Sequence, residues 1–160
     1  MSTLIPNENC YIAFASAKPL VLAAPKASEV LAALDITDFV ISLTAAAQGN
    51  AVPTPRLKRL FETSIPGTRT ASFSAEMYRD DVADTAYNAM SVVNAAGYFY
   101  ISRFGGLGAN NLPIALDKLE VWPVRIISAA GSAMSSNTAQ TFTLTCAVPE
   151  EPVLNAVVAA

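Results

Sequence analysis

The chain has 160 residues, the size of a single domain, and carries 13 acidic and 10 basic residues for a formal net charge of −3. Because it contains no histidine, it lacks Ser-His-Asp and Cys-His nucleophile systems, His-ligated zinc and the commonest general base at neutral pH. Its thinly spread basic residues argue against a dedicated nucleic-acid-binding protein, which normally shows a basic patch.

The sequence shows no sign of export or of a membrane span. The N-terminus, "MSTLIPNENC", has neither the basic n-region nor the apolar h-region of a signal peptide. No stretch reaches the roughly 18 apolar residues that span a bilayer, so we expect no membrane partner. Cys10 and Cys146 are interpreted as small buried residues in a reducing compartment rather than as a disulfide.

The first third of the chain predicts two strands, a short helix and a loop. "CYIAFAS" (Cys10–Ser16) and "DITDFVISLTA" (Asp35–Ala45) are rich in β-branched and aromatic residues and predict strands. Between them, "KASEVLAAL" has the composition of a short helix that Ser28 can cap. The following "AAAQGNAVPTP" predicts a loop of about a dozen residues, and loops of that length in compact domains are usually functional or disordered.

A hairpin is predicted next. "RLKRLFETSI" and "RTASFSAEMY" flank Pro66-Gly67, a pair that suits the two central positions of a type II turn. In the second segment small or apolar residues alternate with polar ones, which predicts a strand with one buried face. The residues expected on that face are Ala71, Phe73, Ala75 and Met77.

A helix is expected immediately after the hairpin. Asp81 is a plausible N-cap, Asp84 occupies the capping-box position three residues on, and Gly97 can close the C-terminus. Acids in the first turn complement the positive end of the helix dipole. The predicted buried stripe consists of Val82, Ala86, Met90 and Val93.

The last third predicts three further strands. They are Tyr98–Phe104, Lys118–Ala129 and Gln140–Val148, separated by the loops "GGLGANNLP" and "AGSAMSSNT". Pro123 inside a strand implies an edge position or a bulge. The tail "PEEPVLNAVVAA" ends in small apolar residues that suit docking on a neighbouring molecule. The fold class is therefore mainly β (α+β), with one flanking helix.

The acidic residues are the first candidates for chemistry. Asp80, Asp81 and Asp84 could form a metal site, but the regular oxygen spacing around a glycine that calcium loops need is missing, and capping explains all three. Glu62 and Glu76 lie on neighbouring predicted strands and could form a carboxylate pair, although solvent-facing positions account for them equally well. We expect no metal and no cofactor.

Other candidate motifs are weak. "GGLGAN" (Gly105–Asn110) lacks the third glycine of a phosphate-binding loop and is not followed by an obvious helix start. "RLKR" (Arg56–Arg59) fits a solvated strand edge better than a phosphate site, and no serine lies in a G-x-S-x-G elbow. The sequence offers no catalytic residue, and we expect no enzyme.

The order of elements resembles that of a known family. "LDITDFVISLTA", "SIPGTRTASFSAEMYRDD" running into "VADTAYNAM", "GYFYISRFG", "KLEVWPVRI" and "TAQTFTLTCAV" resemble the major tail tube proteins of long, non-contractile-tailed bacteriophages. The resemblance covers about residues 28–148. It implies one tail-tube domain over residues 1–160 with a β-barrel or β-sandwich core, related in fold to the type VI secretion tube protein.

The resemblance also implies a function. Six subunits would form a ring, and stacked rings would form the hollow tail tube of a virion, through which genomic double-stranded DNA passes without specific binding. Assembly would take place in the bacterial host cytoplasm, with the tape measure and other tail proteins as partners. The net negative charge of the chain suits such a conduit, because a basic wall would bind the phosphates of the passing DNA.

Three segments are implied as contacts between rings: the long loop at residues 45–56, an N-terminal arm at residues 1–9 and a C-terminal arm at residues 149–160. The loop residues expected to make these contacts are Gln48, Gly49, Asn50, Val52, Pro53, Thr54 and Arg56. Two other classes stay open from the sequence, a capsid or tail decoration protein and a small β-barrel carrier of apolar ligands.

Overall fold

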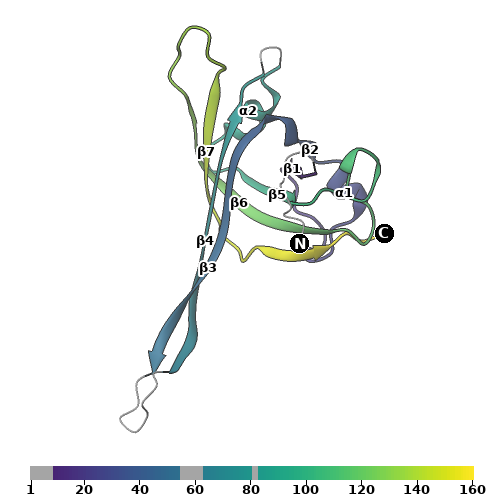
Figure 1. Cartoon of the computed structure of the whole chain (residues 1–160), viewed down its shortest axis with the longest axis vertical. Helices are drawn as coiled ribbons and strands as arrows, with labels where there is room; N and C mark the ends of the chain where they lie inside the picture. The colour runs from purple at the N-terminus through teal and green to yellow at the C-terminus, as the bar shows by residue number, and fades with distance from the viewer. Residues whose placement is uncertain (1–8, 55–62, 81–82) are drawn as a thin grey trace, which may run out of the picture.

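The computed structural model describes residues 9–54, 63–80 and 83–160, and its chain trace is shown in Figure 1. Most of these residues form strands, which confirms the mainly β expectation. The elements in chain order are β1 (Tyr11–Ala15), α1 (Ala27–Leu31), β2 (Leu34–Asp35), the 3-10 helix η1 (Thr37–Phe39), β3 (Val40–Thr54), β4 (Thr63–Tyr78), α2 (Thr85–Met90), β5 (Ala96–Ser102), the 3-10 helix η2 (Ala109–Asn111), β6 (Lys118–Gly131), β7 (Thr141–Ala147) and β8 (Val153–Val157).

All eight strands belong to one antiparallel sheet. Its order is β2-β1-β5-β6-β7-β4-β3, and β8 pairs with β6 beside this path. The end strands β2 and β3 do not pair with each other in the described part of the chain. The sheet is therefore open, so of the two cores expected, β-barrel or β-sandwich, a closed barrel is not formed by the described strands.

The sheet rolls around a core on its inner face. The Phe73 ring on β4 and the Phe99 ring on β5 have centroids 4.5 Å apart, although β6 and β7 separate these strands in the sheet. The predicted period of two is confirmed in β4 and β7, where alternate side chains enter this core. The buried members are Ile12, Phe14, Ile36, Phe73, Ala75, Met77, Ala86, Met90, Phe99, Ile101, Trp122, Val124, Ile126, Phe142, Leu144 and Cys146.

Helix α2 packs against this core through the predicted residues Ala86 and Met90. The Tyr87 ring meets the Phe142 ring edge-on with centroids 5.2 Å apart. The predicted stripe is wrong at Val93, which is 57% exposed because the helix ends at Met90. Val82, the first member of the stripe, lies outside the described residues.

A second apolar cluster lies on the outer face of β1, β5 and the first part of β6. Its buried members are Tyr11, Ala13, Val30, Tyr100, Leu119, Val121, Ala156 and Val158. Helix α1 contributes Val30, and the C-terminal segment contributes Ala156 and Val158. The C-terminal segment expected as an arm for contacts between rings pairs with β6 as β8 and buries Ala156 and Val158 in its own domain.

The second predicted strand, Asp35–Ala45, begins later than predicted, at Val40. The carboxylate of Asp35 accepts a 2.9 Å hydrogen bond from the backbone N–H of Thr37 and a 2.6 Å bond from the Thr37 hydroxyl. This local bonding is typical of aspartate and competes with strand pairing. The chain consequently forms β2 and the short helix η1 before β3 begins at Val40.

The predicted loop at residues 45–56 and the predicted turn at Pro66-Gly67 are both wrong where the structure describes them. Strand β3 continues to Thr54 and pairs with β4 from Val40↔Met77 to Thr54↔Thr63. Pro66 and Gly67 lie inside β4, opposite a register shift between Gly49 and Ala51. They form an irregularity in a long hairpin rather than its turn.

The expected helix caps also differ from those observed. The N-cap of α1 is Lys26 rather than Ser28, and the Glu29 carboxylate accepts the Lys26 N–H at 2.9 Å. Asp84 rather than Asp81 directly precedes α2, and Asp81 lies outside the described residues. Gly97 lies in β5, where a Cβ atom would be 2.2 Å from Cε2 of Phe14, so it is required by packing rather than by a helix end.

Pro123 was predicted to lie at a strand edge or in a bulge, and it lies at a local edge of β6. Strand β8 pairs with β6 only as far as Val121, and β7 pairs with β6 only from Arg125 onward. Pro123 falls in the gap between these two partners and pairs only with Tyr98 of β5 on the other edge of β6, so it lies at a local edge, where proline is tolerated. Cys10 and Cys146 are both free thiols; Cys146 is buried, as expected, whereas Cys10 is half-buried.

Candidate assembly interface

The most distinctive surface is a two-stranded ribbon that leaves the body of the molecule, visible at the lower end of Figure 1. Strand β7 pairs with β4 only from Phe73 to Tyr78. Residues 46–54 and 63–72, which we call the arm, therefore pair only with each other within the described chain. A two-stranded hairpin is marginally stable in water, so an arm of this length gains stability when a partner covers it.

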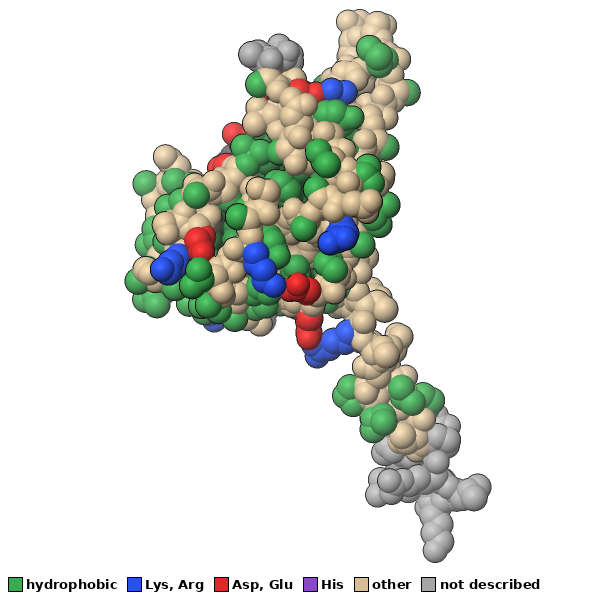
Figure 2. Space-filling model, turned by 180° about the vertical axis from the view of Figure 1, so that it is seen from behind, with side chains coloured by type: hydrophobic (Ala, Val, Ile, Leu, Met, Phe, Trp, Pro, Cys, Tyr) green, Lys and Arg blue, Asp and Glu red, His purple; other side chains and the backbone are tan. Residues whose placement is uncertain are grey.

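The arm exposes apolar side chains near its end. Val52 and Ile65 are register partners on β3 and β4 and are 47% and 54% exposed. Figure 2 shows hydrophobic side chains gathered on the arm beside its grey tip. An exposed apolar cluster on a projecting element is typical of a protein–protein contact.

Two prolines restrict how the arm can be covered. Pro53 and Pro66 lie on opposite strands, paired with Ser64 and Ala51. Neither residue has an N–H to donate to a further strand, which discourages edge-to-edge extension at these positions. Gly67 is required beside them, since a Cβ atom there would be 2.9 Å from the Asn50 carbonyl oxygen. The end of the arm therefore suits packing through its side chains.

Six of the seven predicted contact residues fall on this element. Gln48, Gly49, Asn50, Val52, Pro53 and Thr54 lie in β3 and are brought together on the arm, whereas Arg56 lies outside the described residues.

Side chains of the body hold the root of the arm. Arg103 reaches the Ala45 carbonyl through Nη2 at 3.4 Å and is itself held by Glu120 through Nε at 2.6 Å. Further out, Arg69 on β4 forms an ion pair of 2.6 Å with Glu151. This outer pair is exposed and contributes little to stability.

Part of the outward face of the sheet carries hydroxyl side chains in register. Thr44, Ser74, Thr145 and Ser128 follow one another across β3, β4, β7 and β6. Alternate positions point inward to the core, so these side chains point outward. We call this surface the hydroxyl face; its hydroxyl residues are Ser42, Thr44, Ser72, Ser74, Ser128, Thr141, Thr143 and Thr145.

Asp84, one of the acidic candidates, is used structurally. Both Arg79 Nε, at 2.9 Å, and Arg79 Nη2 donate to Oδ2 of Asp84. The guanidinium also lies 4.1 Å from the centroid of the Tyr87 ring, and the bond to Asp84 raises the Arg79 pKa. Asp84 does not use its side chain as a helix cap. In the described part of the chain, no group of three or more His, Cys, Asp or Glu side chains could hold a metal ion.

The glycine-containing loop does not present free amides for a phosphate. The N–H groups of Gly106 and Gly108 donate to backbone carbonyls of the same loop at 2.8 and 3.0 Å. Oδ2 of the buried Asp117 accepts the N–H groups of Leu107 at 2.9 Å and Ile114 at 2.8 Å. These bonds fix the shape of the loop from within.

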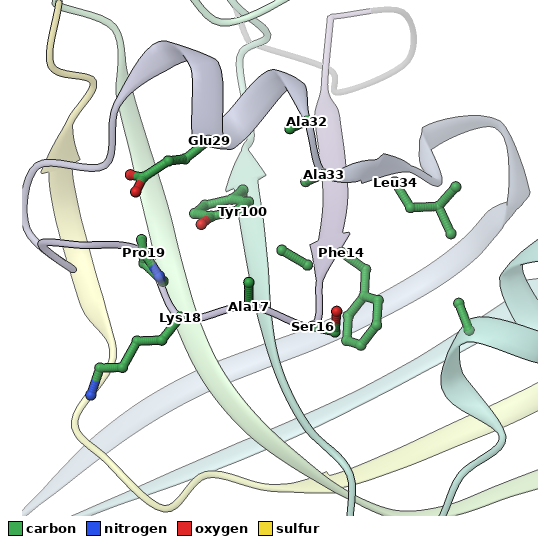
Figure 3. Close-up of a pocket in the computed structure, with 12 residues that line it drawn as sticks. Phe14, Ser16, Ala17, Lys18, Pro19, Glu29, Ala32, Ala33, Leu34 and Tyr100 are labelled. Carbon is green, nitrogen blue, oxygen red and sulfur yellow. The ribbon is translucent and has the colours of Figure 1, made fainter.

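A pocket of 510 Å³ lies between α1, the end of β1 and the following segment, as shown in Figure 3. Phe14, Tyr100 and several alanines form its walls, and Lys18 and Glu29 lie at its polar side. The Glu29 carboxylate already accepts the N–H groups of Lys26 and Leu20. These bonds lower its pKa, and they commit its polar atoms to the local fold.

Two structural residues escaped the sequence analysis. Asp117 orders a loop, and Glu120 joins Arg103 to the indole N–H of Trp122. A single acid within the apolar run "KLEVWPV" was a usable signal, since a buried carboxylate requires partners.

Comparison with known proteins gives three findings. A family model described as "Phage tail tube protein" matches residues 2–160. No curated protein sequence matches the chain. Several solved structures share the fold, at 10–15% identity.

Two of these structures come from gene transfer agent (GTA) particles. A chain of the native GTA virion has a TM-score of 0.56 and 14% identity, over 94% of this chain and 98% of that one. A chain of the C6-symmetric tail of the empty GTA particle has a TM-score of 0.55 and 15% identity, over 97% and 100%. A chain of the anti-feeding prophage baseplate, 6-fold symmetrised, has a TM-score of 0.51 and 10% identity, over 95% of each chain.

Proposed function

The chain belongs to the phage tail tube protein family, whose model spans residues 2–160, and on this premise we propose that its subunits form stacked hexameric rings. The stack is the hollow tube of a phage-like tail, and genomic double-stranded DNA passes through it without specific binding. The six-fold ring is supported by two structures of similar fold, the C6-symmetric GTA tail and the 6-fold symmetrised baseplate. The role is structural rather than catalytic.

Closure of the ring is supported by the open edge of the sheet. Strand β3 is an end strand of 15 residues, and its outer edge pairs with no other described strand. Long open edges invite pairing and are normally covered. In a closed ring of identical subunits, each subunit covers the open edge of its neighbour.

The arm is the observation that carries the proposal for stacking. Nine residues of β3, 46–54, extend about 30 Å at roughly 3.3 Å per residue, which is enough to leave one ring and reach the next. Stable contacts bury about 1,000 Å² or more, and the exposed pair Val52 and Ile65 supplies an apolar centre. Gln48, Gly49, Asn50, Pro53, Thr54 and Arg56 complete the proposed contact.

The proposal includes further partners and a location. A tube of fixed bore surrounds the tape measure protein during assembly and meets other tail proteins at its two ends. We place assembly in the bacterial host cytoplasm and the finished protein in the virion tail. None of the helices in residues 9–54, 63–80 and 83–160 has the length and apolar character of a membrane span.

The test compares the full chain with a variant that lacks the arm. Replacing residues 48–70 by an Asn-Gly turn leaves the strand pairing of β4 with β7, from Phe73 to Tyr78, intact. We expect normal circular dichroism and melting, and rings without elongated tubes in negative-stain microscopy and sedimentation. Tubes of normal length from this variant would show that the stacking contact lies elsewhere.

Point variants sharpen the comparison. Val52→Ser with Ile65→Ser removes the apolar centre without shortening the arm and is expected to shorten tubes markedly. Leu154→Ser on β8 is the matched control, because Leu154 is 46% exposed, close to the value of Val52. It should leave tube length unchanged.

A further inference from the structure

The pocket beside α1 is open because small side chains line it. Five alanines and the rings of Phe14 and Tyr100 form its walls (Figure 3). An alanine side chain is a single methyl group, so the space above it stays available to a side chain from outside. The volume of 510 Å³ lies within the range of about 300–1,000 Å³ that is typical of binding sites. The alanines are Ala15, Ala17, Ala32, Ala33 and Ala89.

The charged groups at the pocket are already engaged. Of the described residues that line it, Lys18 and Glu29 carry charge. The Lys18 ammonium lies 3.2 Å from the Glu150 carboxylate, and the Glu29 carboxylate accepts the N–H groups of Leu20 and Lys26. The pocket therefore offers apolar contact rather than charge recognition, and it fits an aliphatic group.

The rim of the pocket is apolar as well. Leu20 and Leu31 are 81% and 48% exposed, and they follow and precede the lining residues Pro19 and Ala32 in the chain. In protein–protein contacts, an anchoring side chain fills a pocket while the residues around it exclude water. An apolar pocket with an apolar rim therefore fits a protruding element of another protein.

The pocket and the arm lie at opposite ends of β5. Ala15, which lines the pocket, pairs with Tyr98 near the start of β5, whereas Arg103, just after its end, contacts the Ala45 carbonyl at the root of the arm. Val52 lies seven positions beyond Ala45, or about 23 Å at roughly 3.3 Å per residue. Figure 1 shows the arm leaving the body away from α1 and α2. An arm therefore cannot reach the pocket of its own subunit.

We infer that this pocket receives the apolar end of an arm, formed by Val52 and Ile65, from a second copy of the chain in the adjacent ring. The inference rests on the proposed function and adds the receiving site to it. The arm and the pocket are different surfaces of one chain, so their contact is heterologous and can repeat from ring to ring without closing.

The end of the arm matches the pocket in charge and in stiffness. In residues 46–54 and 63–72 the one charged side chain is Arg69, and it pairs with Glu151. Val52 and Ile65 are register partners on the arm, and β-branched side chains are stiff at χ1. Docking them therefore costs less side-chain entropy than docking long flexible residues.

Filling the pocket tests the inference without removing a contact. Ala32→Phe and Ala89→Leu each enlarge a lining side chain at a position exposed in the single subunit, so we expect normal circular dichroism and melting. Rings should still form, and elongated tubes should be lost in negative-stain microscopy and sedimentation. Asn155→Leu, at an exposed position of β8, is the matched control and should give tubes of normal length. Tubes of normal length from both filled variants would overturn the inference.

Crosslinking in assembled tubes tests the contact with the pocket left open. The background is Cys10→Ser, since burial raises the pKa of Cys146 to about 12 and leaves it an unreactive thiol. Val52→Cys with Ser16→Cys places one thiol on the arm and one at the pocket. A short bismaleimide should then produce a ladder of linked subunits on denaturing gels that continues beyond the hexamer, because each subunit is joined to both adjacent rings. Val52→Cys with Asn155→Cys should produce no ladder.

The outcomes separate this inference from the proposed function. Intact tubes without a ladder from the Val52 and Ser16 pair would overturn the inference and leave the tube proposal standing. A ladder that stops at the hexamer would place the contact within one ring, and a ladder from the Asn155 pair would place the receiving site on β8; either result contradicts the inference. Failure of the unmodified chain to form tubes would instead count against the proposed function.

Discussion

The indole N–H of Trp122 donates a 2.8 Å hydrogen bond to Oε2 of Glu120. The same carboxylate accepts hydrogen bonds from Nε and Nη2 of Arg103, at 2.6 and 3.1 Å, and this pairing raises the pKa of Arg103. Because Arg103 also reaches the Ala45 carbonyl, the largest buried side chain, an ion pair and the root of the arm form one connected group.

Removing the Glu120 carboxylate should destabilise the subunit. Glu120→Leu leaves the buried indole N–H without an acceptor, and the free energy of unfolding should fall by about 1–3 kcal/mol. Glu120→Gln keeps an acceptor for the indole and should lose less. Urea unfolding followed by circular dichroism measures both. The exposed pair Lys18 and Glu150 is the control, and Glu150→Leu should cost under about 1 kcal/mol. Equal losses for the two Glu120 variants would contradict the role of the indole bond.

Gly97 should tolerate no side chain. In Gly97→Ala the new Cβ would be 2.2 Å from Cε2 of the buried Phe14, and overpacking of this kind costs about 1–3 kcal/mol. Gly131→Ala is the matched control, since no atom lies within 4 Å of the Cβ built there. Thermal melts of the two variants should differ clearly. A Gly97→Ala protein as stable as the control would refute the packing argument.

Asp117 should control the order of the loop that follows β5. Its Oδ2 accepts the amides of Leu107 and Ile114, so Asp117→Leu should raise hydrogen exchange at these two amides. Asp117→Asn keeps a carbonyl oxygen and should raise exchange less. Exchange at the β7 amides is the internal reference. Unchanged protection of Leu107 and Ile114 in Asp117→Leu would show that the carboxylate does not order the loop.

Stability should decline at high pH through the buried tyrosines. Burial, the largest cause, raises the pKa of Tyr11 and of Tyr100 from 10.0 to about 12. Each folded-state pKa lies above the unfolded value, so the contribution is fully present below pH 10 and is lost as pH rises toward 12. Tyr100→Phe should flatten the fall in the urea midpoint between these values. An unchanged slope would show that Tyr100 does not contribute to it.

The sequence predicted the fold best where one face of a strand is buried. In β4 and β7 the alternation of apolar and polar residues matches the observed burial. Residues 46–54 carry no apolar period from which a strand can be predicted, because both faces of the arm are exposed. Its small residues therefore predict a loop, and Pro66-Gly67 predicts a turn, since the pairing of β3 with β4 cannot be derived from local sequence.

The structure corrects the conformation of the predicted contact segment, whereas its contact between rings stays a prediction. The described residues among those predicted for inter-ring contact lie on the arm, and they form a strand rather than a loop. The C-terminal segment could not be placed from local pattern, because its apolar residues are explained by partners on β6 and α1 that are distant in sequence. Asp117 and Glu120 were missed for the same reason, since their roles depend on partners brought close by the fold.

The direction of the arm has a consequence for the assembled tube. Every subunit of a ring extends its arm from the same end of the body, so a stack built as proposed has polarity. One terminus of the tube presents unoccupied arms, and the other presents the surfaces that receive them. Growth is then directional, and the proteins that close the two termini must differ in shape. One must bind the free arms, and the other must bind the surfaces on which arms dock.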